Sequence, residues 1–172
     1  MNPSDVKYIV IHCSAGFAGR EGIERYWKET LGWKSPGYHR LVETDGTIHS
    51  LAGFKSQVNG VRGYNDKAIH ICYVGGVEKD GNGYKAKDTR TDAQKHSLQK
   101  CIVEAIYWLA DHGKNVEKDL LVLGHRDFSN DKNANGIIES WERIKECPSF
   151  DAMQEYMIYS ATNSDMRLPS NR

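Results

Sequence analysis

"KYIVIHC", residues 7–13, is a short run rich in β-branched residues, and its apolar side chains stand next to one another instead of alternating with polar ones. Such a run is typical of a strand that is buried on both faces, at the centre of a sheet. The stretch "AIHICYVGGV" at 68–77 has the same character, and "DLLVLGH" at 119–125 reads as a further short strand. We therefore expect a sheet built around residues 7–13.

The segments between these strands show helix and hairpin patterns. Residues 20–33 carry apolar side chains at helical spacing and end near a glycine. Residues 91–113 open with a T-x-x-Q capping box and continue with an apolar stripe. Residues 38–51 are two strand-like runs joined by Asp-Gly, which predicts a hairpin. Residues 78–90 predict a mobile polar surface loop, and residues 149–160 predict a last helix.

The order of these elements predicts an α/β fold, with a central mixed β-sheet flanked by α-helices. The chain of 172 residues is long enough for one well-packed domain and short for two. We place that domain at residues 1–160 and expect residues 161–172 to be a polar, flexible tail.

Composition excludes several classes of partner. The 23 Lys and Arg balance the 23 Asp and Glu, so no broad field attracts nucleic acid or an anionic membrane. No apolar run approaches the ~18 residues of a membrane span, and residues 1–7 are too polar for a signal peptide. We expect a monomer that is made in the cytosol and does not insert into a membrane.

The four cysteines contain no CxxC pair, so reduced thiols are expected in a cytosolic chain. Cys13, Cys72 and Cys101 sit inside apolar runs, as buried small hydrophobic residues do. Cys147 differs, because it lies between a glutamate and a proline in a polar, turn-prone context. A role other than packing is therefore predicted for Cys147.

Two histidines occupy the same structural situation. His12 ends the strand "YIVIH" and His125 ends "LLVLGH". Polar groups at the carboxyl ends of buried strands are where ligands usually bind in an α/β sheet. If the two strands are parallel neighbours, both imidazoles reach one rim of the sheet, and Cys147 completes three ligands for a tetrahedral zinc ion with one position open. Pattern alone also allows each histidine to be an ordinary core or edge residue.

Five blocks occur in the order found in type 2 N-acetylmuramoyl-L-alanine amidases: "YIVIHCSA", "GYHRLVETDGTI", "RGYNDKAIHICYVGG", "GHRD" and "KECPSFD". The chain resembles this family, which includes phage lysozyme-amidases and is related to the peptidoglycan recognition proteins, from about residue 7 to 159. The resemblance implies a zinc hydrolase that cuts the amide between N-acetylmuramic acid and L-alanine in bacterial peptidoglycan. It also implies that His12, His125 and Cys147 are the zinc ligands, and that the enzyme reaches the cell wall after release by other means.

The resemblance implies further site residues. Tyr38 in "GYH" and Lys145 in "KEC" match the catalytic pair, and a phenol and an ammonium can both donate to a developing oxyanion. Which of them handles the proton stays open. Asn65 matches a substrate-side position, although an ordinary turn residue fits equally well. His39 is a second substrate-side candidate, but it neighbours Tyr38 on a strand and should point to the opposite face unless a twist or bulge intervenes.

The sequence departs from the family at two positions. Gly60 stands where family members commonly carry a histidine, which puts one substrate or outer contact in doubt. His70 stands where the strand usually has glycine, which places a bulky imidazole where a strand or ligand approaches closely.

The stretch "DKNANGIIESWE", residues 131–142, has the spacing of a calcium loop. The expected ligands are Asp131, Asn133, Asn135, the Ile137 carbonyl, Glu139 and the bidentate Glu142. Calcium here would clamp the loop and fix the approach of Lys145 and Cys147. The alternative is a polar turn without an ion.

Two other functions compete with the zinc amidase. A non-catalytic peptidoglycan-binding module would be expected to lack a zinc ligand, whereas Cys147, Tyr38 and Lys145 are all present. A calcium-dependent interaction module would need paired loops with flanking helices, and the sequence has one loop, preceded by a strand-like segment.

Overall fold

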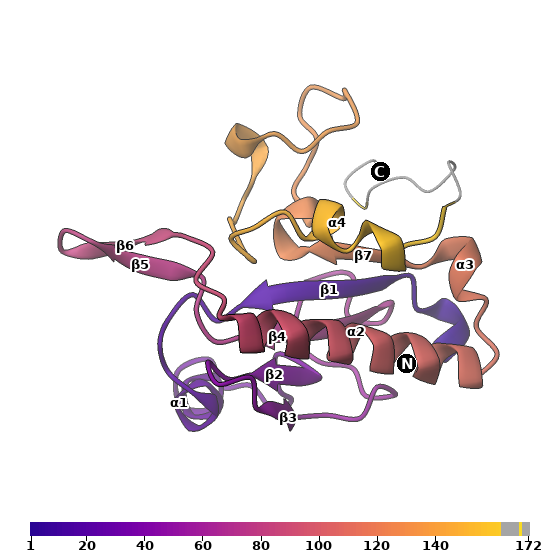
Figure 1. The fold of residues 1–172 in the computed structure, drawn as a ribbon, viewed down its shortest axis with the longest axis horizontal. Coiled ribbons are helices and arrows are strands. Elements are labelled where there is room, and N and C mark those ends of the chain that lie inside the picture. The colour runs from indigo at the N-terminus through magenta and orange to yellow at the C-terminus, as the bar shows by residue number, and fades with distance from the viewer. Residues whose placement is uncertain (163–168, 170–172) are drawn as a thin grey trace.

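A five-stranded sheet with the strand order β3-β2-β4-β1-β7 forms the centre of the computed structural model, which describes residues 1–162 and 169 (Figure 1). The strands are β1 (Tyr8–Cys13), β2 (Arg40–Val42), β3 (Ile48–Ser50), β4 (Ala68–Tyr73) and β7 (Leu121–Gly124). β1 pairs in parallel with both β4 and β7, β2 is parallel to β4, and β3 is antiparallel to β2. The predicted mixed sheet of an α/β fold is confirmed.

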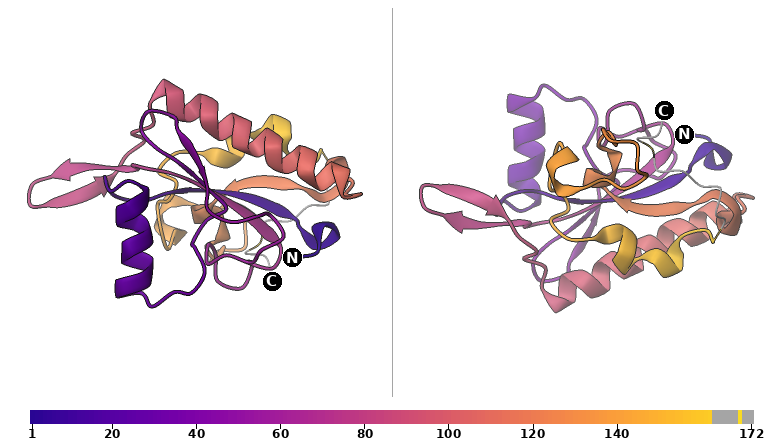
Figure 2. Two further views of the ribbon diagram at one scale, coloured as in Figure 1. Left: turned by 90° about the horizontal axis from the view of Figure 1, so that it is seen from below. Right: turned by 90° about the horizontal axis from the view of Figure 1, so that it is seen from above.

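Helices cover both faces of the sheet. Figure 2 shows α2 and α4 on one face, and α1 with the segment around residues 130–142 on the other. The α-helices are α1 (Arg20–Arg25), α2 (Asp92–Asp111), α3 (Val116–Asp119) and α4 (Ala152–Glu155), and η2 (Tyr26–Thr30) extends α1 as a π-helical turn. The 3-10 turns are η1 (Pro3–Asp5), η3 (His125–Phe128), η4 (Ser140–Glu142) and η5 (Met157–Tyr159).

The alternation of side chains along β1 decides which face each residue serves. Ile9 and Ile11 are fully buried and belong to the main core with Leu98 and Ile102 of α2. Val10 belongs to the smaller core on the other face. Successive side chains of a strand point to opposite faces, so His12 follows Val10 to the face that α1 covers.

The predicted capping box fixes the start of α2. The Gln94 backbone N–H donates to Thr91 Oγ1 at 3.0 Å, and the Thr91 N–H donates to Gln94 Oε1 at 3.1 Å. The Gln94 side-chain amide also donates to the Val74 carbonyl at 2.8 Å, which ties the helix to the end of β4. Gly113 follows the helix with φ +82°, a conformation that glycine adopts without strain.

Three predicted elements differ from the structure. Residues 78–90 are not a simple loop, because β5 (Val77–Asp80) and β6 (Gly83–Ala86) pair as an antiparallel hairpin that projects from the body (Figure 1). Asp-Gly and Asn-Gly steps favour such a turn, and Gly81 has φ +56° there. The helix predicted at 20–33 changes to the π-helical turn after Arg25. The helix predicted at 149–160 is divided into α4 and η5, since Tyr156 leaves the helical conformation.

The remaining predictions concern the tail, the membrane and the cysteines. Most of the predicted tail, residues 163–168 and 170–172, lies outside the described residues. In the described part of the chain, no helix is both long and apolar enough to cross a membrane. The four cysteines are free, and Cys13, Cys72 and Cys101 are buried as expected.

The packing of α2 on the sheet generates a stability prediction. Leu98 is fully buried, so Leu98→Ala should lower the free energy of unfolding by about 2–5 kcal/mol through lost burial and a residual cavity. Tyr107 on the same helix is 72% exposed, and Tyr107→Ala should change stability by less than about 1 kcal/mol. Urea denaturation followed by circular dichroism measures both. Equal losses in the two variants would contradict this assignment of the core.

Candidate active site

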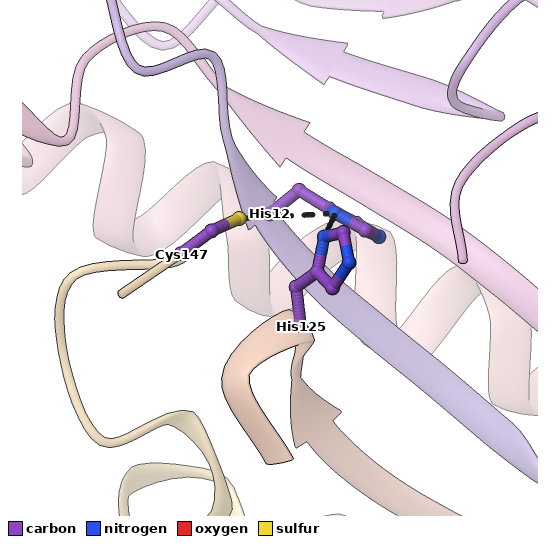
Figure 3. Close-up of side chains that lie close together, drawn as sticks. All are labelled: His12, His125 and Cys147. Carbon is purple, nitrogen blue, oxygen red and sulfur yellow. Dashed lines mark hydrogen bonds between the residues drawn. The ribbon is translucent and has the colours of Figure 1, made fainter. Parts of the chain in front are cut away.

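His12, His125 and Cys147 come together at one rim of the sheet. Their ligand atoms all lie within 4.8 Å of one another, and Figure 3 shows the three side chains pointing toward a common point. Ile11 of β1 is paired with Gly124 of β7, so the next residue along each strand is one of the two histidines. The prediction that parallel pairing brings both imidazoles to one place is confirmed.

The distances between these atoms test whether a metal ion fits. His12 Nδ1 lies 3.2 Å from His125 Nδ1 and 3.8 Å from Cys147 Sγ. Tetrahedral zinc with ordinary bond lengths separates two nitrogens by about 3.3 Å and a nitrogen from a sulfur by about 3.6 Å. Two of the three separations therefore match those that one tetrahedral ion requires, and the ligand atoms of His125 and Cys147 lie within 4.8 Å of each other. Three protein ligands leave the fourth position of a tetrahedral ion open.

Burial prepares these groups to act as ligands. It lowers the pKa of His12 well below its usual value, with the neighbouring His125 as the next cause. Burial and the nearby Lys145 lower the pKa of His125 to about 4, so both imidazoles are neutral near pH 7. Burial raises the pKa of the Cys147 thiol, so its thiolate form needs a neighbouring cation. Two neutral imidazoles and such a thiol are a donor set that suits zinc.

Backbone contacts hold Cys147 in place. The Cys13 N–H at the end of β1 donates to Cys147 Sγ at 3.2 Å, and the Arg126 N–H donates to the Cys147 carbonyl at 2.7 Å. Cys147 is thus fastened both to the strand that carries His12 and to the turn that carries His125.

Tyr38 and Lys145 border the same place. The Tyr38 ring centroid is 5.0 Å from that of His12 and 5.3 Å from that of Trp27. Burial raises the pKa of Tyr38 well above its usual value, so its hydroxyl stays protonated and can donate. Lys145 is exposed, and with Tyr38 it lines a cavity of about 540 Å³ whose wall includes Trp27 and Trp33.

A second hollow of about 170 Å³ is lined by His125 and Lys145, so Lys145 stands between the two. A larger hollow of about 850 Å³ lies along α1 near Glu43, and its wall contains neither Tyr38 nor Lys145. The 540 Å³ cavity is lined by both of these residues, and the Tyr38 ring lies next to His12, so this cavity is the candidate cleft.

Comparison with known proteins identifies the family. Residues 2–148 match the family model described as N-acetylmuramoyl-L-alanine amidase. The chain belongs to this amidase family.

Individual relatives agree with the family. The endolysin of Enterobacteria phage K11 is 35% identical over 144 residues, which cover 82% of this chain and 79% of that protein. Human peptidoglycan recognition protein 3 is 26% identical over 81% of this chain and 41% of its own length. Among solved structures, the N-acetylmuramoyl-L-alanine amidase LysC from Clostridium intestinale URNW has a TM-score of 0.60 at 20% identity, covering 91% of this chain and 85% of LysC. That similarity shows a shared fold.

The two substrate-side candidates of this amidase domain have internal partners. His39 is fully buried, its Nδ1 lies 3.0 Å from the His70 backbone nitrogen, and its Nε2 lies 3.0 Å from the Ser56 carbonyl oxygen. Both ring nitrogens of His39 are thus used by partners inside the protein. Asn65 Oδ1 accepts from the Val61 N–H at 2.7 Å, which is the role of an ordinary turn residue.

The two departures from the amidase pattern occupy one place in space. A Cβ atom added to Gly60 would lie 2.3 Å from both Cγ and Nδ1 of the His70 ring, a distance that no real contact allows. The His70 ring therefore fills the space that a side chain at position 60 would need. His70 Nδ1 lies 3.0 Å from His12 Nε2, a contact to a candidate ligand that the sequence did not reveal.

The predicted calcium loop is closed by its own hydrogen bonds. Glu142 is 1% exposed, and its carboxylate accepts from the backbone N–H groups of Lys132, Asn133 and Glu139. Asp131 Oδ2 accepts from the Gly136 N–H at 2.7 Å. Among the described residues, the loop carboxylates do not form a cluster close enough to hold an ion, as His12, His125 and Cys147 do. Calcium binding stays a prediction.

Calcium titration tests that prediction. If the loop binds calcium, millimolar calcium should raise the melting temperature of chelator-treated, zinc-reloaded protein, and Glu142→Gln should abolish the rise because the bidentate ligand is lost. Glu146→Gln, which alters an exposed partner of Arg143, is the control and should keep the rise. An unchanged melting temperature in calcium would show that residues 131–142 are an ordinary turn.

Proposed function

We propose that this protein is a zinc-dependent N-acetylmuramoyl-L-alanine amidase that hydrolyses the amide between N-acetylmuramic acid and L-alanine in bacterial peptidoglycan. The observation that carries the proposal is the cluster of His12, His125 and Cys147, in which the two separations from His12 suit a tetrahedral ion, beside a cleft that contains Tyr38 and Lys145. Membership of the amidase family and similarity to a phage endolysin support peptidoglycan as the partner and the bacterial cell wall as the place of action.

The ligands fit zinc by donor type and by spacing. His12 Nδ1, His125 Nδ1 and Cys147 Sγ would hold the ion, and Cys147 would bind as the thiolate. When bound there, zinc supplies a water whose pKa is lowered to about 7 and polarises the carbonyl of the scissile amide. The rest of the chemistry falls to the residues around the ligands.

Tyr38 and Lys145 supply hydrogen-bond donors where negative charge develops on the amide oxygen. Tyr38 stays protonated because of burial, and its ring is held between His12 and Trp27. Donors that are fixed before the reaction need no reorganisation in the transition state, which makes them effective. Lys145 adds an ammonium donor that lines both the cleft beside Tyr38 and the small hollow beside His125. Both residues therefore act by stabilising the oxyanion.

The cleft itself has the character expected for a polymer substrate. Its wall combines the apolar rings of Trp27 and Trp33 with the polar groups of Ser14 and Lys145. Apolar walls exclude water, while a few polar groups orient the ligand. A cavity of about 540 Å³ has the size of a pocket that can hold a small segment of a larger substrate.

A non-catalytic peptidoglycan-binding module is the second candidate, because human peptidoglycan recognition protein 3 is also similar to this chain. A binding module has no need of a cluster of three metal-ligand side chains or of a partly buried phenol beside them. The complete set in this chain favours the enzyme.

Loss of one ligand tests the zinc assignment. Cys147→Ser should lower zinc occupancy and abolish release of L-alanine amino termini from purified peptidoglycan, since a serine hydroxyl is a poor zinc ligand. Cys101→Ala, a change in the core away from the ligands, should keep both zinc and activity. Metal analysis and an amino-terminus assay measure the two properties. Full occupancy and full activity in Cys147→Ser would refute the assignment.

The donor pair generates a separate prediction. Tyr38→Phe and Lys145→Ala should each lower turnover by ~10²-fold or more while zinc content stays unchanged, because each removes a transition-state donor. Lys132→Ala, at an exposed position of the neighbouring loop, should leave turnover within about threefold. Near-normal turnover in both donor variants would mean that zinc acts without them, and release of reducing sugar ends would mean a glycosidase.

A further inference from the structure

His70 lies directly behind the candidate ligand His12. It belongs to β4, the neighbour of β1, and its side chain is fully buried. His70 Nδ1 is 3.0 Å from His12 Nε2, the ring nitrogen of His12 that faces away from His125 and Cys147. A histidine that binds a metal through one nitrogen almost always uses the other nitrogen in a hydrogen bond that orients the ring. In this chain that hydrogen bond is to His70.

The surroundings leave one position for the His70 ring. A Cβ atom on residue 60 would come within 2.3 Å of the ring, so only glycine at position 60 leaves room for it. On its other side the ring is stacked on His39, with an angle of 11° between the ring planes and 6.1 Å between the centroids. The His70 ring is therefore held between position 60, His39 and His12.

The protonated ring nitrogens of His12, His70 and His39 can be assigned from the hydrogen-bond partner of each nitrogen. The His39 Nδ1 accepts from the His70 backbone N–H, so His39 carries its proton on Nε2, which donates to the Ser56 carbonyl. When His12 Nδ1 binds a metal ion, the proton of His12 must be on Nε2. The partner of that N–H is His70 Nδ1, which must then be an acceptor, and this places the His70 proton on its own Nε2.

We infer that His70 is a positioning residue for the metal site: its Nδ1 accepts the His12 Nε2–H and thereby fixes Nδ1 of His12 as the metal-binding nitrogen. Gly60 contributes to this positioning, because it provides the space for the His70 ring. His70 Nε2, which is buried and has no partner among the described residues, is the atom that carries the proton in this arrangement. The inference rests on the proposed zinc site and specifies how that site is built.

The His70 imidazole differs from a carboxylate that would accept the same hydrogen bond from His12. A carboxylate behind a ligating histidine would add a negative charge and raise the basicity of the ligand. A buried neutral imidazole fixes the direction and tautomer of His12 without adding charge to the site. His70 therefore orients the ligand through hydrogen-bond geometry and packing.

Histidine tautomers can be measured directly in the wild-type protein. NMR with nitrogen-labelled histidine should show His12 protonated on Nε2 and His70 protonated on Nε2 in the zinc-loaded form. This readout does not depend on activity or on any substitution. A His70 ring protonated on Nδ1 in the zinc-loaded protein would overturn the inference, because that ring could not accept from His12.

Two substitutions of similar size separate hydrogen bonding from packing. In His70→Asn the side-chain amide oxygen would stand near the place of the imidazole Nδ1 and can accept, whereas His70→Leu fills comparable space without an acceptor. His70→Leu should weaken zinc binding by about 10–100-fold, and His70→Asn should stay within about threefold of wild type. Competition with a chromogenic chelator gives the affinities. Equal affinities for His70→Leu and wild type, or equal losses in the two variants, would overturn the inference.

Gly60→Ala tests whether the space at position 60 is needed to hold the His70 ring in place. In the wild-type background it should weaken zinc binding, since the added methyl displaces the His70 ring. In a His70→Ala background the same change should have little further effect, because the ring is no longer there. Additive losses in this cycle would show that the two positions act independently. Failure of wild-type protein to bind zinc at all would instead refute the proposed function, so the two failures are distinguishable.

Discussion

The parallel pairing of β1 with β4 on one side and β7 on the other is the constraint on which the site depends. Register places Ile11 beside Gly124, and the next residues of the two strands are His12 and His125. Alternation along β1 sends Ile9 and Ile11 into the core under α2 and leaves His12 on the other face. The same ladder that buries the apolar side chains therefore aims two imidazoles at one point, and a shift of one residue would turn His12 into the core.

Much of the fold could be predicted because its signals are local. Continuous apolar runs marked β1 and β4, and the Thr91–Gln94 capping box marked the start of α2. The β5–β6 hairpin was missed because most of its side chains are exposed and follow no apolar alternation. The last helix was overextended because its apolar residues Met157 and Ile158 are 69% and 86% exposed, so they do not mark a buried helical face.

Some residues of the candidate site could likewise be predicted from local sequence signals, and others could not. Strand-end histidines are visible in the sequence, and the polar context of Cys147 set it apart from the other cysteines. Lys145 was indicated only by the resemblance to the amidase family. The contact of His70 with His12 could not be predicted from the sequence, because it depends on residues 60 and 70 together. A histidine at 70 and a glycine at 60 each look like a departure, and their meaning appears only when β4 and the loop before it pack together.

The three candidate ligands are also held by different forces. His12 and His125 belong to the buried sheet and its end, whereas Cys147 belongs to a long segment fastened mainly by hydrogen bonds. The buried carboxylate of Glu142 gathers three backbone N–H groups of this segment, and Ser129 Oγ accepts from the Ile144 N–H. Segments with few buried apolar contacts open at lower free energy than a core strand. A metal ion bound to all three ligands would therefore join the segment to the sheet and hold Lys145, two residues before Cys147, at the cleft.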